Sequence, residues 1–160
     1  MPYLRIMTYL LKTIFFLSLS TKLLGQNITG EWMGEIYLKR SSGEYSIFFP
    51  VYFEIRHDSI TNAITGVSTT KSYDTVIVDC LIEGAYDPQK NVYTLLETKA
   101  VSSNKETVLS LPVLNRFKMA YEYERKKEWV LSGSCECINS LANPLCYQKL
   151  KIILRRYKGK

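Results

Sequence analysis

The chain has 160 residues, of which 46% are hydrophobic, 12% aromatic and 22% charged, so it fits one globular domain and is not a disordered chain. There are 21 basic and 15 acidic residues, but three basic residues lie in the first twenty-five positions and six in the last twelve. The isoelectric point of 9.1 therefore reflects the two ends rather than a basic body. The twelve tyrosines favour strands. With one histidine, the chain is poor in the side chain most used for acid–base catalysis.

The start of the chain has the pattern of a secretory signal. Basic residues precede the apolar residues 13–20, and Gly25 offers a small residue for cleavage. The apolar stretch between the flanking lysines is shorter than the roughly 20 residues of a membrane-spanning helix, so a retained anchor is the weaker alternative. We expect a signal peptide at 1–25 and a mature domain at 26–160. The protein would then be secreted or periplasmic, with no transmembrane span after processing.

In the rest of the chain, apolar and polar side chains alternate, which is typical of half-buried strands. The alternation predicts eight strands, at 28–39, 44–56, 62–70, 74–83, 92–102, 116–125, 128–135 and 147–157. In the second strand, Ile47, Phe49 and Phe53 are expected on one side. Pro50 has no amide hydrogen and must lie at an edge, a bulge or an unpaired position. Residues 84–91 are expected to turn the chain.

Eight sequential strands with one apolar side each can hide those sides in a barrel or between two stacked sheets. Closure also removes the exposed strand edges, and the lack of crossover helices argues against a parallel sheet. We therefore expect an all-β fold, a single antiparallel up-and-down eight-stranded barrel, with a two-sheet β-sandwich as the alternative. A barrel of this size is filled by its own side chains or holds one small ligand.

Four cysteines in the mature chain are consistent with disulfides formed in an oxidising compartment. Cys135 and Cys137 are too close in one strand to bridge each other comfortably, which leaves two pairings. We favour Cys137 with Cys146, and Cys80 with Cys135. A zinc site on these thiolates is disfavoured because the usual two-residue spacer is absent, so no metal is expected.

The first mature strand contains Gly30-Glu31-Trp32, and the last contains Arg155-Arg156. In these features the chain resembles lipocalin-type (calycin) barrels. Over most of its mature length it also resembles small exported bacterial domains of uncharacterised role, which begin with Gly-x-Trp-x-Gly and end with a Ser-Gly, Cys, basic-strand pattern. The resemblance to lipocalins implies that Trp32 lies at the base of the barrel and that Arg156, or secondly Arg155, packs across its indole.

The sequence contains no Gly-x-Ser-x-Gly, phosphate-loop or His-Glu-x-x-His motif. His57 lies where the second strand ends, and we expect a solvated turn residue there rather than a catalytic one. On the fourth strand we expect the side of Cys80 to face inward and Asp79 to lie outside; the alternative is an interior carboxylate. We therefore predict no enzymatic activity and no cofactor.

Large aromatic and sulfur-containing side chains on two strands predict a site for a small guest. They are Phe49, Phe53, Phe117, Met119 and Tyr121. We expect an exported, non-enzymatic barrel that binds a small apolar or amphipathic ligand. The alternative is an envelope or extracellular interaction or structural module whose barrel is filled by its own side chains.

The last strand and the residues after it are rich in basic side chains. They are Lys149, Lys151, Arg155, Arg156, Lys158 and Lys160. A solvated, solubilising end is the favoured interpretation, and attraction to an anionic surface is the alternative. Nucleic acid is not expected as a partner of an exported chain with a net acidic body.

Overall fold

The computed structural model describes residues 26–71, 77–104, 114–123, 128–138 and 150–157, and the predicted signal peptide lies outside them. The described residues form eight strands and no helix, so they contain no helix that could span a membrane. The strands are β1 (Gly30–Lys39), β2 (Tyr45–His57), β3 (Ala63–Lys71), β4 (Ile77–Asp87), β5 (Val92–Ser103), β6 (Asn115–Tyr123), β7 (Trp129–Cys137) and β8 (Leu150–Arg156). The all-β prediction is confirmed.

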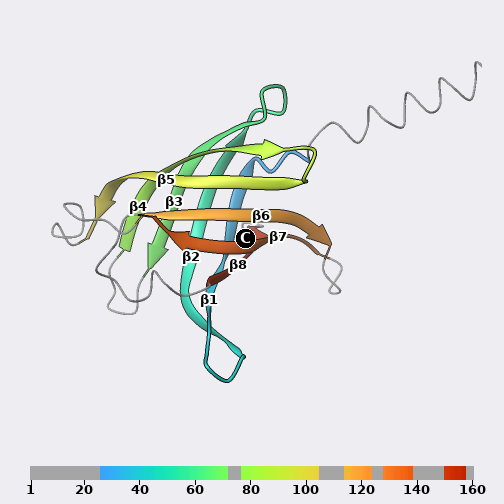
Figure 1. Ribbon diagram of the computed structural model, residues 1–160. Helices are drawn as coiled ribbons and strands as arrows, with labels where there is room; N and C mark the ends of the chain where they lie inside the picture. The colour runs from blue at the N-terminus through green and yellow to red at the C-terminus, as the bar shows by residue number, and fades with distance from the viewer. Residues whose placement is uncertain (1–25, 72–76, 105–113, 124–127, 139–149, 158–160) are drawn as a thin grey trace, which may run out of the picture.

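The strands form one closed antiparallel barrel in which each strand pairs with its neighbours in the chain (Figure 1). The last strand returns to the first, with Trp32 opposite Arg156 and Leu38 opposite Leu150. The predicted up-and-down barrel is therefore confirmed, and a single closed sheet replaces the two stacked sheets of the alternative.

The fourth strand is longer than predicted. The turn was expected at 84–91, and this prediction is wrong for residues 84–87, because β4 continues through Gly84 to Asp87. A Cβ atom at Gly84 would lie 2.0 Å from the carbonyl oxygen of Thr94, so only glycine lets β4 and β5 approach so closely. The turn itself occupies 88–91, and Asn91 adopts the left-handed φ of 52° that asparagine tolerates.

The first half of β2 departs from simple alternation. The β1–β2 register shifts so that Phe48 is the extra residue of a β-bulge. Ile47, expected to face inward with Phe49, is consequently 52% exposed, and that part of the prediction is wrong. Pro50 lies just before Val51, the first residue of β2 that pairs with β3. Pro50 is therefore unpaired on the side of β3, as expected for a residue without an amide hydrogen.

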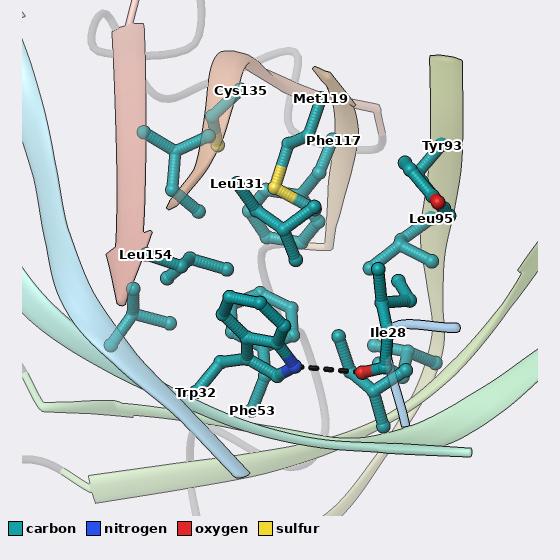
Figure 2. Packing of buried hydrophobic residues seen from close by; sticks show 14 of the residues in the cluster. Ile28, Trp32, Phe53, Tyr93, Leu95, Phe117, Met119, Leu131, Cys135 and Leu154 are labelled. Atoms are coloured by element: carbon teal, nitrogen blue, oxygen red, sulfur yellow. Dashed lines mark hydrogen bonds between the residues drawn. The ribbon is translucent and has the colours of Figure 1, made fainter. Parts of the chain in front are cut away.

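Side chains at alternate strand positions fill the middle of the barrel (Figure 2). The largest of them, which have no exposed surface, are Trp32, Tyr93, Phe53 and Phe117. The rings of Phe53 and Phe117 meet edge to face, with centroids 5.1 Å apart and planes at 84°. This is a favoured geometry for an aromatic pair and adds to the stability from apolar burial.

The two ends of the barrel are built from different residues. Residues 26–29 lie across the end at which β1 begins and β8 ends, and we call this the plugged end. At the opposite end, the inward side chains of Ser68, Glu97 and Asn115 form a buried polar cluster. We call this the carboxylate end.

Candidate functional site

The plugged end is sealed by Ile28, whose side chain is fully buried in the core. Its carbonyl oxygen accepts a hydrogen bond of 2.8 Å from Trp32 Nε1 (Figure 2). Its amide donates to His57 Nδ1 at 3.5 Å, and Tyr93 Oη donates to the carbonyl oxygen of Gln26 at 2.6 Å. Side chains of β1, β2 and β5 thereby hold the N-terminal segment across the barrel.

Arg156 adds a fourth strand to this closure. Its guanidinium carbon lies 5.2 Å from the centroid of the Trp32 ring. Its Nη2 atom donates to the carbonyl oxygens of Thr29, at 3.1 Å, and Asn27, at 3.4 Å. The structure thus brings together the tryptophan and the arginine that the resemblance to lipocalins implies for the barrel base.

His57 is buried, so the expectation of a solvated turn residue is wrong. The end of β2 places its ring against those of Tyr86 and Tyr93, with centroids 6.1 and 5.8 Å away. Within the described part of the chain, its Nε2 atom has no hydrogen-bond partner. Burial lowers the pKa of His57, and the nearby Asp58 carboxylate only partly opposes this. The neutral form is the one whose Nδ1 atom can accept the amide of Ile28.

An aromatic row leads from the plugged end to the surface. The ring of Tyr121 meets Trp32 edge to face at 6.0 Å and stacks on Trp129 at 4.8 Å. Tyr123 packs against the other ring of this stack, 5.2 Å from Trp129. Trp129 is 45% exposed, so the row ends in solvent. Tyr121 therefore supports the closure of the plugged end.

The five residues predicted to line a ligand site do not meet in one place. Phe53, Phe117 and Met119 are fully buried at the centre of the barrel. Phe49 is half-buried towards the carboxylate end, whereas Tyr121 is half-buried at the plugged end. The filled centre separates these two. Phe53 lies opposite Ser68 in the β2–β3 register, and Phe117 lies two positions from Asn115 on the same side of β6, so both are next to the buried polar cluster.

A buried carboxylate that is not among the predicted site residues lies at the carboxylate end. Glu97 of β5 is 2% exposed. Its Oε1 atom accepts a hydrogen bond of 2.6 Å from Ser68 Oγ, and its Oε2 atom accepts bonds of 2.8 Å from the amide and Nδ2 of Asn115. The alternation contained the signal, because Glu97 follows Tyr93 and Leu95 on one side of its strand.

The side chain of Glu97 replaces a missing part of the β5–β6 ladder. Backbone pairing between these strands ends at Leu96 and Arg116, and the register of β5 against β4 shifts twice beyond that point. The backbone amide of Asn115 is satisfied by the Glu97 carboxylate instead of by a carbonyl of β5. At this place, side chains rather than backbone groups hold the barrel wall together.

The carboxyl group of Glu97 lies in surroundings that disfavour its charge. Its donors are a neutral hydroxyl and neutral amides, and no cation among the described residues forms an ion pair with it. Burial raises the pKa of Glu97, which the three hydrogen bonds partly oppose. Burial and the fields of Glu97 and Asp79 raise the pKa of the Cys80 thiol to about 12, so this thiol stays protonated.

Asp79 lies on the outer side of β4, as expected. Thr69 Oγ1 donates to its Oδ1 atom at 2.7 Å, and Ser102 Oγ donates to its Oδ2 atom. The neighbouring Cys80 and Ile82 are buried. Asp79 therefore links β3, β4 and β5 from outside, and the interior carboxylate of the barrel is Glu97 instead.

The predicted Cys80–Cys135 disulfide is not formed, since Cys80 is a buried free thiol. Two strands separate β4 from β7 along the wall, and Cys135 belongs to the main core cluster whereas Cys80 does not. The pairing of Cys137 with Cys146 stays a prediction, because Cys146 lies outside the described residues. In the described ranges, no group of three or more His, Cys, Asp or Glu side chains could hold a metal ion.

Basic residues of β8 make contacts within the barrel. Arg155 Nε lies 3.7 Å from the carboxylate of Glu128, and Lys151 Nζ lies 5.9 Å from the centroid of the Tyr45 ring. Three further basic residues lie outside the described ranges, namely Lys149, Lys158 and Lys160. Attraction of this end to an anionic surface stays a prediction.

Similarity to known proteins is found in structure and not in sequence. No protein-family model matches the sequence, and no curated protein matches it. Among solved structures, the chain is similar to Rv2717c from M. tuberculosis, with 13% sequence identity and a TM-score of 0.38. The match covers 82% of this chain and 93% of that chain. The assignment of this chain to the eight-stranded antiparallel barrels rests on its own strand pairing.

Proposed function

We propose that the protein is an exported, non-enzymatic, lipocalin-like barrel that binds one small amphipathic ligand at its carboxylate end. The contrast between the two barrel ends is the observation that carries this proposal. Residues 26–29 seal one end, whereas the other contains a buried polar cluster opposite apolar side chains.

The plugged end is unsuited to ligand entry. Ile28 fills it, and side chains of four strands donate to or accept from the segment around Ile28. A ligand that entered here would have to displace a fully buried side chain and break these hydrogen bonds. Entry from the opposite end would leave Ile28 and these hydrogen bonds in place.

At the carboxylate end, the inward side of the wall is chemically divided. Over β3 to β6 the buried side chains are polar or small, namely Ser68, Cys80, Glu97, Ala100 and Asn115. Over β1, β2, β7 and β8 the corresponding side chains are mainly apolar, namely Leu38, Phe49, Val51, Cys135 and Leu150. A ligand with an apolar tail and one polar head matches such a divided surface, because each part meets its own kind.

Calorimetric titration of the protein with 1-octanol tests this proposal. We expect saturable binding of one molecule, weakened severalfold by Phe49→Ala, because Phe49 is a half-buried apolar side chain that packs against the core and would lose apolar contact with the ligand tail. Ile60→Ala is the matched control, since Ile60 is a large apolar residue in the β2–β3 turn at the plugged end and is 91% exposed. Absence of saturable binding would refute the proposal.

A second candidate function is that of an interaction or structural module. The fully buried Phe53, Phe117 and Met119 favour it, because they fill the centre of the barrel. An experimental structure with no interior cavity larger than about one or two water molecules, together with no octanol binding, would favour this candidate.

A further inference from the structure

We infer that the outer side of strands β2, β1 and β8 is a docking surface for a second copy of this chain, in a dimer with two-fold symmetry. The ligand site of the proposed function lies inside the barrel, so this surface and its occupant are independent of that function. Exposed apolar side chains, a hollow and the placement of charges on this side of the wall support the inference.

Alternation and register define which side chains belong to this surface. On β1, Trp32 and Ile36 are buried in the core, so the outward side chains are Glu31, Met33, Glu35, Tyr37 and Lys39. Residues directly opposite each other in an antiparallel pair point to the same side of a sheet. The other outward side chains are therefore Tyr45, Ile47, Pro50, Tyr52 and Glu54 on β2, and Lys151, Ile153, Arg155 and Tyr157 on or just after β8. We call this set the outer face.

The outer face is rich in large apolar and aromatic side chains. Those that are about half exposed are Met33, Tyr45, Ile47 and Tyr157. Single apolar residues are ordinary on a protein surface, but apolar side chains that continue over three neighbouring strands are typical of a contact site. Tyrosine, methionine and arginine are also residue types enriched in protein–protein contacts.

One half of the outer face is hollowed, and the other half projects. The half near the plugged end contains a hollow of about 390 Å³, lined mainly by outer-face residues that include Met33, Pro50 and Tyr157. Tyr45 and Ile47 lie in the other half, on the β1–β2 hairpin, which projects from the barrel (Figure 1). The exposed apolar side chains of one copy therefore match the hollow of another.

The charges of the outer face are separated along the same direction. Glu31 lies at the hollowed end, where Arg56 offsets the charge of Glu54 at a distance of 3.6 Å. Lys39 and Lys151 lie at the projecting end. Both lysines and both glutamates are exposed. The face thus presents an anion at one end and two cations at the other.

A two-fold rotation makes this face complementary to itself. We place the axis between the two faces, across the strands and close to Glu35, so that β1 of one copy runs antiparallel to β1 of the other. Glu31 then faces Lys39 of the second copy, and Ile47 faces the hollow of the second copy. Because the axis exchanges the two copies, each of these contacts forms twice.

The size of the outer face predicts a weak dimer. From Glu31 to Lys39 the face is about 26 Å long, and three strands are about 14 Å wide. Two copies would bury on the order of 1,000 Å² in total, near the lower limit for a specific contact. Near the axis, the two Glu35 carboxylates lie among Arg155 and Lys151 of both copies, so the charge there is mixed. We therefore expect a dissociation constant in the micromolar range.

Sedimentation equilibrium over a range of protein concentrations tests the inference. We expect a reversible monomer–dimer equilibrium that weakens with added salt, because salt screens the contacts between Glu31 and Lys39. Ile47→Asp should weaken dimerisation at least about tenfold, since it places a charge where an apolar side chain faces the hollow. Ile60→Asp is the matched control, because Ile60 is exposed in the β2–β3 turn outside the outer face, and it should change nothing.

Exchange of charges tests the two-fold geometry. Glu31→Lys and Lys39→Glu should each weaken dimerisation about tenfold, because like charges then face each other twice. An equimolar mixture of these two variants should form a heterodimer about as stable as the dimer of the unaltered protein, because both pairs across the axis are again of opposite charge. Glu83→Lys, the same exchange at an exposed position of β4, is the control and should have no effect.

The outcomes decide for or against the inference. All these variants change exposed side chains, so circular dichroism should show the strand content of the unaltered protein. A protein that stays monomeric up to about 1 mM would overturn the inference. A dimer that Ile47→Asp and both charge variants leave intact would also overturn it, because such a dimer uses another face. If the mixture of charge variants does not restore dimerisation, the two-fold arrangement is wrong.

Discussion

The two ends of this barrel are held together by different kinds of hydrogen bond. At the plugged end, Trp32, Tyr93 and Arg156 bind backbone carbonyl oxygens of the N-terminal segment, and no carboxylate takes part in these bonds. At the carboxylate end, a single acidic side chain replaces backbone pairing between β5 and β6. The comparison teaches that closure of the strand ladder does not determine what each end can bind.

The largest expected effect comes from a variant that disrupts the plugged end. Trp32→Ala removes a fully buried indole, its bond to Ile28 and its contact with Arg156, so it should lower the free energy of unfolding by about 3 to 5 kcal/mol in urea titration. Trp129→Ala is the control, with an expected loss of about 1 kcal/mol because it removes ring contacts with Tyr121 and Tyr123 from a half-exposed side chain. Equal losses would show that the plug contributes nothing to stability.

The next effect breaks the carboxylate end. Glu97→Leu leaves the amide and Nδ2 of Asn115 without an acceptor, and should cost about 2 kcal/mol in the same titration. Asp79→Leu is the matched control. Asp79 is also a carboxylate that accepts hydrogen bonds, here from two hydroxyl groups, but it lies on the outer side, where water can take over these bonds. Asp79→Leu should cost less than Glu97→Leu, and the reverse order would contradict a structural role of the buried cluster.

A smaller effect concerns the cation over the indole. Arg156→Ala should cost about 1 kcal/mol, because the guanidinium is partly exposed although it contacts Trp32 and two carbonyl oxygens. Arg155→Ala, which removes the contact with Glu128 but none with the Trp32 ring, should cost less. If both variants lose the same stability, the pairing of Arg156 with Trp32 has no energetic role.

The pH dependence of stability distinguishes the two ends by its sign. The folded pKa of Glu97 is raised above the ordinary 4.5, so the stability contribution of this group is full below pH 4.5 and is lost as the pH rises through the folded pKa. The free energy of unfolding of the protein minus that of Glu97→Gln should therefore fall as the pH rises above 4.5. A difference that is flat or rises with pH would contradict the unfavourable burial of this carboxylate.

At the plugged end the sign is opposite. The folded pKa of His57 is lowered below the ordinary 6.5, so its contribution is full above pH 6.5 and is lost as the pH falls through the folded pKa. His57→Phe keeps an aromatic ring against Tyr86 and Tyr93 but cannot titrate. The stability of the protein relative to His57→Phe should therefore decrease on acidification below pH 6.5. A constant difference over this range would show that protonation of His57 is not coupled to unfolding.

Prediction from the sequence succeeded where a local pattern decides the outcome. The alternation from Val92 onwards places Tyr93 and Leu95 on one side, and both are buried. It failed for Ile47, because a bulge shifts the register, and a bulge depends on the neighbouring strand. The prediction that Gly84 begins a turn failed for a related reason, since Gly84 lies within β4 where the neighbouring strand approaches closely at Thr94.

The candidate site was less predictable than the fold. His57 stands at a strand end where a solvated residue is expected, and it is buried because the N-terminal segment and the rings of Tyr86 and Tyr93 pack against it. The predicted Cys80–Cys135 pair assumed a contact between strands that the closed barrel keeps apart. Both errors concern which segments meet across the barrel, and side-chain alternation contains no information about that.

The sequence by itself determined the eight strands, their antiparallel order and the inward side of most of them, because a period of two is a property of neighbouring residues. Only the tertiary structure decided which end is sealed and where the interior charge lies. Ser68 and Glu97 are 29 positions apart, and Gln26 and Tyr93 are 67 apart, yet each pair forms a hydrogen bond. Such contacts arise from the closure of the whole barrel, which brings distant strands to one end.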